Sequence, residues 1–145
     1  MFSKACEYAI RACIFIATQS SEGKRVNIKE IAQEIDSPIA FTAKIMQELV
    51  RNNIIQSLKG PTGGFTIEVS SMPEIKLKHI VFAIDGDKIY TACSLGMKEC
   101  SEQHPCPVHS QYKIIKNGIR EMLESTDLKQ LCQGLKNGST FLRNQ

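Results

Sequence analysis

The sequence lacks any long run of apolar residues. The longest run near its start, Ala12–Ala17, has six residues, whereas a helix that crosses a membrane needs about 20. The same run is too short for the apolar core of a signal peptide, and Glu7 and Arg11 lie where that core would begin. We therefore expect a cytoplasmic protein that has no membrane partner and whose thiols stay reduced.

The sequence also lacks a strong charge excess, an internal repeat and a low-complexity segment. A net charge of +3 in 145 residues is only a weak indication of an anionic partner. With 42% apolar residues, the chain is expected to form one compact domain, or one domain with an appended element. Such a domain needs no disulfide to fold, so six cysteines favour metal or redox chemistry. Cys6 and Cys13 lie on the apolar face of a first helix and are expected to be buried.

Two short helices are predicted between residues 27 and 52. Asn27 and Glu30 form a variant of the capping box at the start of the first helix. Ser37 is the expected N-cap of the second helix, with Pro38 at its first helical position. The second helix is expected to bury Ile39, Ala43, Met46, Leu49 and Val50. Two short helices joined by a tight turn are typical of a helix-turn-helix.

A β-hairpin is predicted directly after these helices. Residues 54–69, IIQSLKGPTGGFTIEV, contain two alternating segments on either side of a glycine-rich turn. A helix-turn-helix followed by a hairpin is a winged helix, so the expected fold is mainly α with a small β-hairpin wing. This order favours DNA binding over an ordinary α+β core with no nucleic-acid role. The basic residues in or around the expected DNA face are Lys24, Arg25, Lys29, Lys44, Arg51 and Lys59.

The expected DNA contacts come from the start of the second helix and from the tip of the hairpin. Side chains at the helix start would meet base edges, and Phe41 would meet a thymine methyl group. The hairpin tip would reach the minor groove or the backbone. The predicted DNA-binding residues are Lys29, Ser37, Ala40, Phe41, Thr42, Lys44, Lys59, Pro61 and Thr62.

The rest of the chain is predicted to be helical around one loop. One helix is expected over residues 72–84, with Pro73 in its first turn, and a long helix begins at Pro107. Apolar residues on the long helix are spaced four, three, four and three apart, which is an a/d seam typical of a dimer contact. The seam residues are Val108, Tyr112, Ile115, Ile119 and Met122. A homodimer would bind a palindromic site with its recognition helices about 34–36 Å apart.

Four segments are therefore expected along the chain. Residues 1–84 form the winged helix, 85–106 a cysteine-rich loop and 107–124 the dimerisation helix. Residues 125–145 hold a last short helix, capped by Asp127, and a tail that is expected to be loose from Asn137.

The loop contains three cysteines and two histidines in residues 93–109, CSLGMKECSEQHPCPVH. Structural zinc sites usually have paired ligands two to four residues apart, so the wide spacing of Cys93, Cys100 and Cys106 makes zinc less favoured. An iron–sulfur cluster needs ligands on several sides and accepts histidine, which suits this loop and His109. Cys106 and His109 flank the start of the long helix, where the helix dipole stabilises a thiolate. A bound cluster would thereby be linked to dimer geometry and DNA affinity.

Together these motifs resemble the winged-helix repressor family that includes the iron–sulfur regulator IscR and the nitric-oxide-sensing repressor NsrR. The resemblance covers roughly residues 1–125 and is carried by EYAIRA, IAQEIDSPIAFTAKIMQELVRNNII, KGPTGGF and the three cysteines. It implies a repressor that dimerises through the long helix and holds a 2Fe–2S or 4Fe–4S cluster on Cys93, Cys100 and Cys106. The fourth ligand is His109, by its spacing from Cys106, or Glu7 of the partner subunit, as in NsrR-like proteins.

Two departures from the family pattern limit what the resemblance implies. The first cysteine gap is one residue longer than in IscR, and Ala43 replaces a glutamate that helps IscR-like proteins select operators. A cluster-free member that acts through thiol redox or a protein partner is the alternative function. An enzyme is not expected, because nothing supplies an orienting third group for Cys106 and His109.

Overall fold

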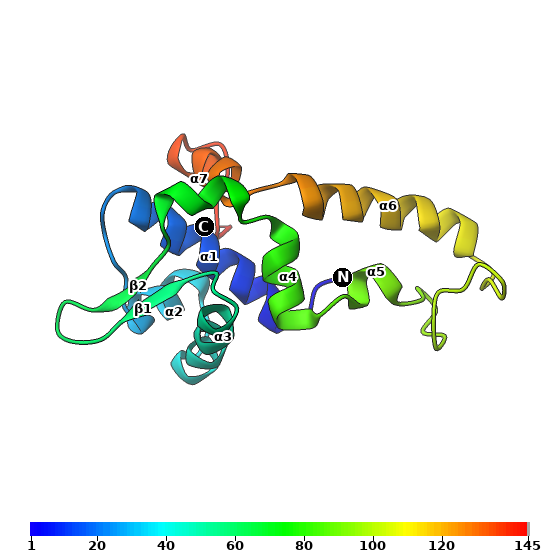
Figure 1. Ribbon diagram of the computed structural model, residues 1–145, viewed down its shortest axis with the longest axis horizontal. Helices are drawn as coiled ribbons and strands as arrows, with labels where there is room; N and C mark the ends of the chain where they lie inside the picture. Colours follow the sequence, from blue (N-terminus) through cyan, green and yellow to red (C-terminus); the bar gives the residue numbers. More distant parts are fainter. Residues whose placement is uncertain (145) are drawn as a thin grey trace.

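The computed structural model describes residues 1–144 and has two parts (Figure 1). A body contains the first three helices, the hairpin and the last helix, and one long helix projects from it with a loop at its far end. The helices and strands in chain order are α1 (Lys4–Ser21), α2 (Ile28–Ile35), α3 (Ile39–Arg51), β1 (Gln56–Leu58), β2 (Gly64–Thr66), the 3-10 helix η1 (Val69–Glu74), α4 (Leu77–Asp85), α5 (Lys88–Thr91), α6 (His109–Ser125) and α7 (Leu128–Lys136). The winged-helix fold, mainly α with a two-stranded hairpin, is confirmed.

Local capping sets the boundaries of the helix-turn-helix. The Asn27 side chain accepts a hydrogen bond from the Glu30 amide, and the Glu30 carboxylate accepts one from the Asn27 amide, so the predicted capping box is confirmed. Asp36 ends α2 in the left-handed conformation, with φ of 53°. The predicted cap of α3 is wrong: Pro38 is itself the N-cap residue, and the Ser37 hydroxyl donates to the Pro38 carbonyl oxygen at 3.4 Å instead of accepting from a helix amide.

The hairpin is anchored to the segment between α1 and α2. Its strands pair antiparallel with Ser57 opposite Phe65. Phe65 exchanges two backbone hydrogen bonds with Val26, at 2.7 and 3.2 Å, so Val26 extends the pairing at the edge of β2. Only glycine fits at position 64, because its φ is +136° and a Cβ would lie 2.6 Å from the Val26 carbonyl oxygen.

The core is built around α1 and includes α7 from the far end of the chain. Buried side chains of α1, α2, α3 and the hairpin meet there, and Leu128 and Cys132 of α7 close it. Cys6 and Cys13 are fully buried, as predicted, and burial is the main cause that raises the pKa of the Cys6 thiol to about 12. Ile39, expected inside, is 49% exposed because it lies in the first turn of α3.

The single helix predicted over residues 72–84 is wrong. Pro73 lies inside η1, and the chain is extended at Ile75 before α4 begins at Leu77. The extended segment pairs with the connection between α6 and α7: the Leu77 amide donates to the Thr126 carbonyl at 2.9 Å, and the Leu128 amide donates to the Ile75 carbonyl at 3.0 Å. These two long-range hydrogen bonds replace helical ones and join the projecting helix to the body.

Two expectations near the C-terminus also need correction. The long helix begins at His109, not Pro107, because a turn closes first, in which the His109 amide donates to the Cys106 carbonyl at 3.0 Å. Val108 is therefore its N-cap residue. The tail is not loose: Leu142 packs against the core and its carbonyl accepts from Arg11 at 3.2 Å. Within residues 1–144, no helix is both long and apolar enough to cross a membrane.

Candidate DNA-binding face and cysteine loop

One side of α3 presents an exposed stripe to solvent. Ala40, Lys44, Gln47 and Arg51 recur at helical spacing on this side and are all exposed. Gln47 was not among the predicted contacts, although its spacing from Lys44 could have indicated it. Polar and basic side chains on one helix face are what base edges and phosphates require.

Two predicted contact residues of α3 face the protein instead. Thr42 has no exposed surface, and its hydroxyl donates to the Pro38 carbonyl oxygen at 2.9 Å. Its assignment to base contact is therefore wrong, because the side chain completes the first turn of α3. Phe41 is half-buried, and its ring packs edge-on against Tyr8 of α1 with centroids 5.7 Å apart. This packing holds the ring against α1 and argues against the predicted thymine contact.

The hairpin tip carries the other predicted contacts. Lys59, Pro61 and Thr62 are exposed, and the Arg25 guanidinium donates to the Thr62 carbonyl at 3.4 Å. Lys29 is exposed at the start of α2, and Ser37 is half-buried between α2 and α3. A hollow of about 470 Å³ separates the hairpin from α3; it is lined by Ile28, Ala43, Gln47, Val50, Arg51, Ser57 and Phe65. Gln47 and Arg51 of the exposed stripe and Ser57 and Phe65 of the hairpin line this hollow, so it lies between the stripe and the wing.

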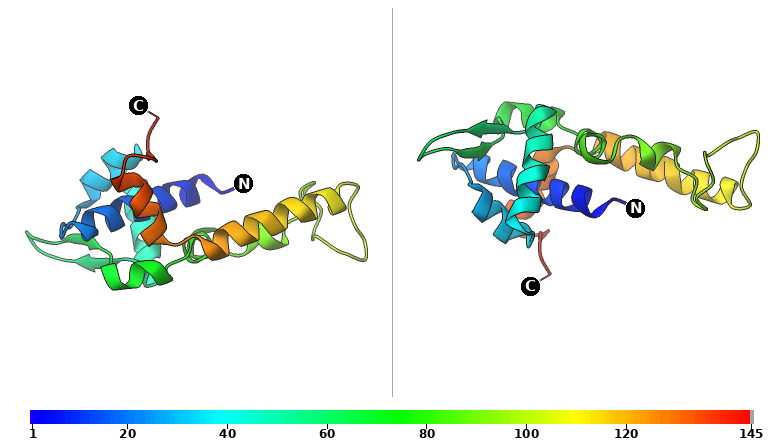
Figure 2. Two further views of the ribbon diagram at one scale, coloured as in Figure 1. Left: turned by 90° about the horizontal axis from the view of Figure 1, so that it is seen from above. Right: turned by 90° about the horizontal axis from the view of Figure 1, so that it is seen from below.

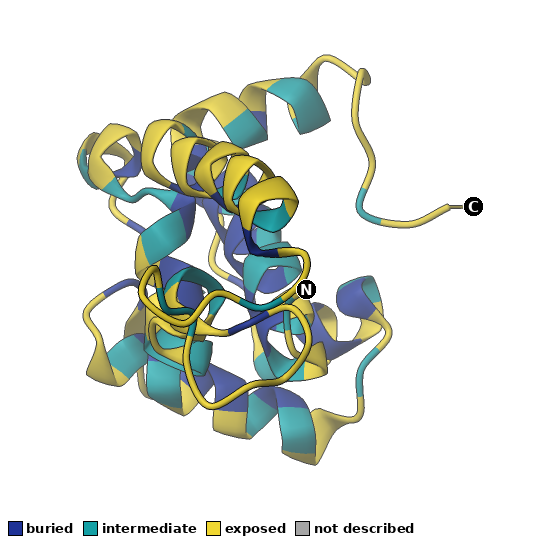
Figure 3. Cartoon of the chain, turned by 90° about the vertical axis from the view of Figure 1, so that its right-hand side faces the viewer, coloured by how far each residue is buried: buried dark blue, intermediate teal, exposed yellow. Residues whose placement is uncertain are grey.

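The cysteine loop lies between α5 and α6, at the end of the molecule away from the hairpin (Figure 1). Figure 3 views the chain from this end, with exposed backbone in yellow. The loop brings its candidate ligands together as two pairs. The Cys100 sulfur lies 3.4 Å from Nδ1 of His109, and Cys106 lies close enough to Cys93 to contribute to lowering the pKa of its thiol. Within the described chain, no three His, Cys, Asp or Glu side chains converge on a point that could hold one metal ion. The loop therefore presents its candidate ligands as two separate pairs.

The chemistry of these groups fits an iron–sulfur cluster. The backbone amides of Leu95 and Met97, followed by Cys106, lower the pKa of the Cys93 thiol, which favours the thiolate that binds iron. His109 is only 8% exposed, and its Nε2 makes no hydrogen bond among the described residues, although the Glu102 carboxylate lies 3.6 Å from it. A buried imidazole nitrogen without a partner is costly unless something else binds it. Three thiols and this imidazole give four donors of the kinds that hold iron–sulfur clusters.

The alternative ligand Glu7 lies elsewhere. It is an exposed residue of the first turns of α1, where its carboxylate is 3.6 Å from the Lys4 ammonium. No hydrogen bond or ion pair links it to the loop in the described part of the chain. Within one subunit, the structure thus places His109, and not Glu7, beside a cysteine of the loop.

Sequence reasoning missed Lys116, which lies on the inner face of α6. The buried residues of this helix are His109, Lys116 and Leu123, each seven residues from the next. The Lys116 ammonium donates to the Ala92 carbonyl at 3.0 Å and lies 5.6 Å from the centroid of the Tyr112 ring. The seven-residue spacing from His109 was visible in the sequence, but lysine at a helix position is ordinarily solvated.

The chain matches the sequence profile of a known protein family over residues 2–134, almost its whole length. The family is Rrf2, described as iron-dependent transcriptional regulators. The chain is a member of the Rrf2 family. The resemblance to the group of IscR and NsrR is thereby confirmed, and both are homologues of this Rrf2 protein.

Two relatives and one solved structure illustrate the similarity. An HTH-type transcriptional regulator of Aquifex aeolicus (strain VF5) is 31% identical over 133 residues, which cover 90% of each chain. The HTH-type regulator IscR of Pectobacterium carotovorum (strain PC1) is 25% identical over 86% of this chain and 74% of its own. The structure of CymR, the global cysteine regulator of B. subtilis, matches with a TM-score of 0.73 and 21% identity, over 92% of this chain and 96% of CymR. At this identity, the match to CymR supports the fold and says nothing about function.

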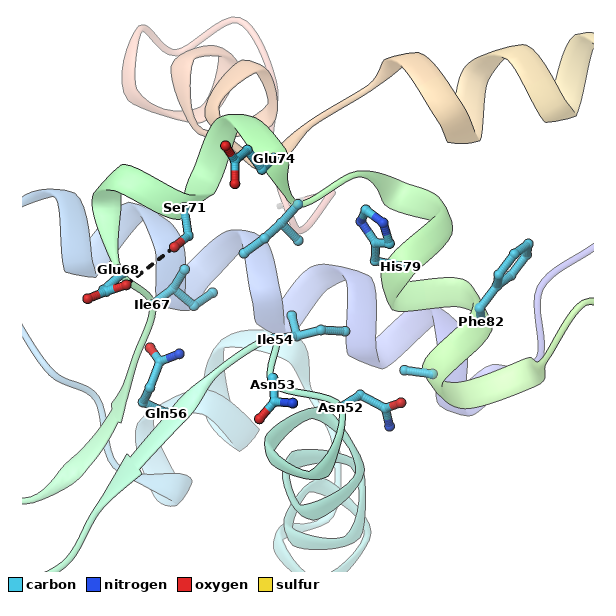
Figure 4. A pocket seen from close by; sticks show the side chains of 12 residues that line it. Asn52, Asn53, Ile54, Gln56, Ile67, Glu68, Ser71, Glu74, His79 and Phe82 are labelled. Atoms are coloured by element: carbon cyan, nitrogen blue, oxygen red, sulfur yellow. Dashed lines mark hydrogen bonds between the residues drawn. The ribbon is translucent and has the colours of Figure 1, made fainter.

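As a member of a family of transcriptional regulators, the Rrf2 protein is not an enzyme. Figure 4 shows one pocket of the protein. The pocket has a volume of about 470 Å³ and lies between the end of α3, the base of the hairpin, η1 and α4. Ser71 donates to Glu68 at 3.4 Å, and Nδ1 of His79 accepts from the Lys76 amide at 2.9 Å. The serine and the histidine are thus engaged separately and form no nucleophile–base pair.

Proposed function

We propose that this Rrf2 protein is a homodimeric repressor that binds a palindromic DNA site in the cytoplasm, and that an iron–sulfur cluster on its cysteine loop controls its DNA affinity. The observation that carries the proposal is the position of the two ligand pairs at the start of α6. The same helix presents the apolar seam. A change at the loop therefore acts on the element that would set the distance between two DNA-binding faces.

The outer face of α6 supports the dimer. Ile115 is 57% exposed, Val108 and Met122 are also exposed, and Tyr112 and Ile119 are half-buried. Ile114 beside them is exposed as well. A contiguous apolar stripe on a projecting helix is unfavourable in water and is typical of an interface. The stripe lies beside the buried face of His109, Lys116 and Leu123, and its exposed members Val108, Ile115 and Met122 are free to meet a second subunit.

The exposed stripe of α3 and the hairpin tip support DNA binding. Lys44 and Lys59 would neutralise phosphates, and Gln47 would reach base edges in the major groove. Ala43 lies in the hollow between them and offers no polar group. We therefore expect this protein to select a different operator from IscR-like proteins that carry a glutamate there.

The cysteine loop would hold the cluster through Cys93, Cys100, Cys106 and His109. When bound, the cluster supplies a charge and a geometry that depend on its oxidation state and on its presence. His109 is favoured over Glu7 because it is buried beside Cys100 and its Nε2 makes no hydrogen bond among the described residues. Zinc is less favoured, because no compact four-ligand arrangement is present among residues 1–144.

A cluster-free regulator is the second candidate function. The CymR-like fold and the separation of the ligands into two pairs favour it. In that case Cys93 and Cys106, which lie close enough for Cys106 to lower the pKa of the Cys93 thiol, would be the residues that respond to oxidants.

Anaerobic purification and reconstitution with iron and sulfide separate the two candidates. A brown protein with matched iron and sulfide content, lost in Cys106→Ala, is the expected result. His109→Ala is expected to lose or destabilise the chromophore, and Glu7→Ala is expected to keep it. A colourless wild-type protein would contradict cluster binding and support the cluster-free function. A normal spectrum for His109→Ala, together with loss in Glu7→Ala, would assign the fourth ligand to the partner subunit.

A further inference from the structure

The inner face of α6 changes in character along its length. Leu123, near the body, is fully buried in an apolar cluster with Leu77 and Val81. Lys116 and His109 follow toward the loop, each seven residues further and therefore on the same side of the helix. The buried stripe thus passes from an apolar residue to a cation and then to an imidazole as it reaches the cysteines.

Lys116 is the unusual member of this stripe. It is only 7% exposed, and burial of an ammonium group is strongly unfavourable unless an anion compensates for it. Its one hydrogen bond goes to a neutral carbonyl, that of Ala92, and the Tyr112 ring adds a weaker attraction. Among residues 1–144, no carboxylate lies within the 4.0 Å of an ion pair from its nitrogen.

The position of the Ala92 carbonyl indicates where the missing anion belongs. Ala92 immediately precedes Cys93, so the hydrogen bond from Lys116 fixes the backbone at the first ligand of the loop. α5, which leads into the loop, runs alongside α6 over this stretch (Figure 2). The Cys93 thiolate is therefore the anionic group nearest in sequence to the point where the ammonium is held.

We infer that Lys116 is a positioning residue of the cysteine loop, which holds Cys93 against α6 and supplies the positive charge that balances its thiolate and the bound cluster. This inference rests on the proposed function. Three thiolates bring three negative charges to the site, and each electron added there brings one more. A buried cation beside Cys93 favours the more negative state, because Coulomb interactions are strong where water is excluded.

The role also links Cys93 to the middle of the projecting helix. His109 and Lys116 are about 10.5 Å apart along the axis of α6, at 1.5 Å per residue. The loop is therefore joined to α6 at two points, through Cys100 at His109 and through Ala92 at Lys116. Displacement of the loop would act on the helix over two turns rather than at its end alone.

The test compares wild-type protein with Lys116→Met, which removes the charge but keeps an unbranched side chain, and with Lys116→Arg, which keeps the charge. Lys98→Met removes an exposed lysine of the same loop and is the matched control. Circular dichroism and thermal unfolding first establish that each variant is folded. The cluster-free proteins are then alkylated with iodoacetamide under anaerobic conditions, and the rate at Cys93 is followed by peptide mass spectrometry.

Alkylation of Cys93 is expected to slow about ten-fold in Lys116→Met, since a neighbouring opposite charge typically changes a pKa by about one unit or more. Lys116→Arg and Lys98→Met are expected to stay close to wild type. In the cluster-loaded proteins, the one-electron redox equilibrium is expected to move about ten-fold toward the oxidised form in Lys116→Met, which is about 59 mV. Unchanged alkylation together with an unchanged potential in Lys116→Met would overturn the inference.

The two readouts keep this inference separate from the proposed function. A wild-type protein that takes up no iron would overturn the cluster-binding function. The alkylation rates of the same proteins would still decide whether Lys116 acts on Cys93, because they are measured without a cluster. Iron uptake by wild type, with no effect of Lys116→Met on either readout, would overturn only the role of Lys116.

Discussion

Gly64→Ala tests how the wing is held to the body. The residue has φ of +136°, and an added Cβ would lie 2.6 Å from the carbonyl oxygen and 3.0 Å from the carbonyl carbon of Val26. Both contacts are with backbone, so no side-chain rotation relieves them. The strain of a sparsely populated backbone conformation is about 1–3 kcal/mol, and the overlap adds to it. We expect a loss of about 3 kcal/mol in the free energy of unfolding, near the upper range of single substitutions.

Gly23→Ala is the matched control. Gly23 also has a positive φ, +74°, but an added Cβ would meet nothing within 4 Å. Its cost is therefore conformational alone, about 1–2 kcal/mol. Urea unfolding measures both variants, and DNA affinity is measured in parallel, because separation of Phe65 from Val26 would release the wing. Equal losses for the two variants would refute the reasoning that the close approach to Val26 positions the wing.

Three further predictions concern the surfaces. Lys59→Ala is expected to weaken DNA binding and to reduce the slope of log K against log salt by about one unit, if the ammonium meets one phosphate. An unchanged slope would show that Lys59 does not contact the DNA. Thr42→Val is expected to cost about 1 kcal/mol of stability, through the lost hydrogen bond to Pro38, and to leave base preference unchanged in selected-sequence binding assays. Ile115→Glu is expected to convert the dimer to a monomer in light scattering. Asn117→Glu, at another exposed position of α6, is expected to remain dimeric. A dimer in both variants would show that this face of α6 is not the dimer interface.

Features set by residues close in sequence were predictable. The capping box of Asn27 and Glu30 depends on two side chains and two amides three residues apart, so the sequence contains all of it. The hairpin was predictable because its alternation and its glycine-rich turn are equally local. The cap of α3 was not predictable, because the pattern allowed either Ser37 or Pro38 as the N-cap residue. Pro38 takes this place, with φ of −58° and ψ of 140°, outside the helix.

Features set by long-range contacts could not be predicted. The break before α4 exists because Leu77 and Ile75 pair with residues about 50 positions later, which no local pattern reveals. Thr42 and Phe41 looked like surface residues at the start of a recognition helix, but packing against α1 and the Pro38 carbonyl determines where they point. Lys116 is buried only because the loop folds back along α6. The sequence thus indicated the candidate ligands but not their pairing or the cation beside them.

The most direct test of the central claim compares DNA affinity of one preparation with and without its cluster. Operators are selected from random duplexes with each form separately, and dissociation constants are measured anaerobically at one salt concentration. We predict that the two forms differ about 5- to 150-fold on at least one selected operator, the usual range of allosteric coupling, and that Cys106→Ala abolishes the difference. Equal affinity of both forms for every selected operator would contradict control by a cluster at the cysteine loop.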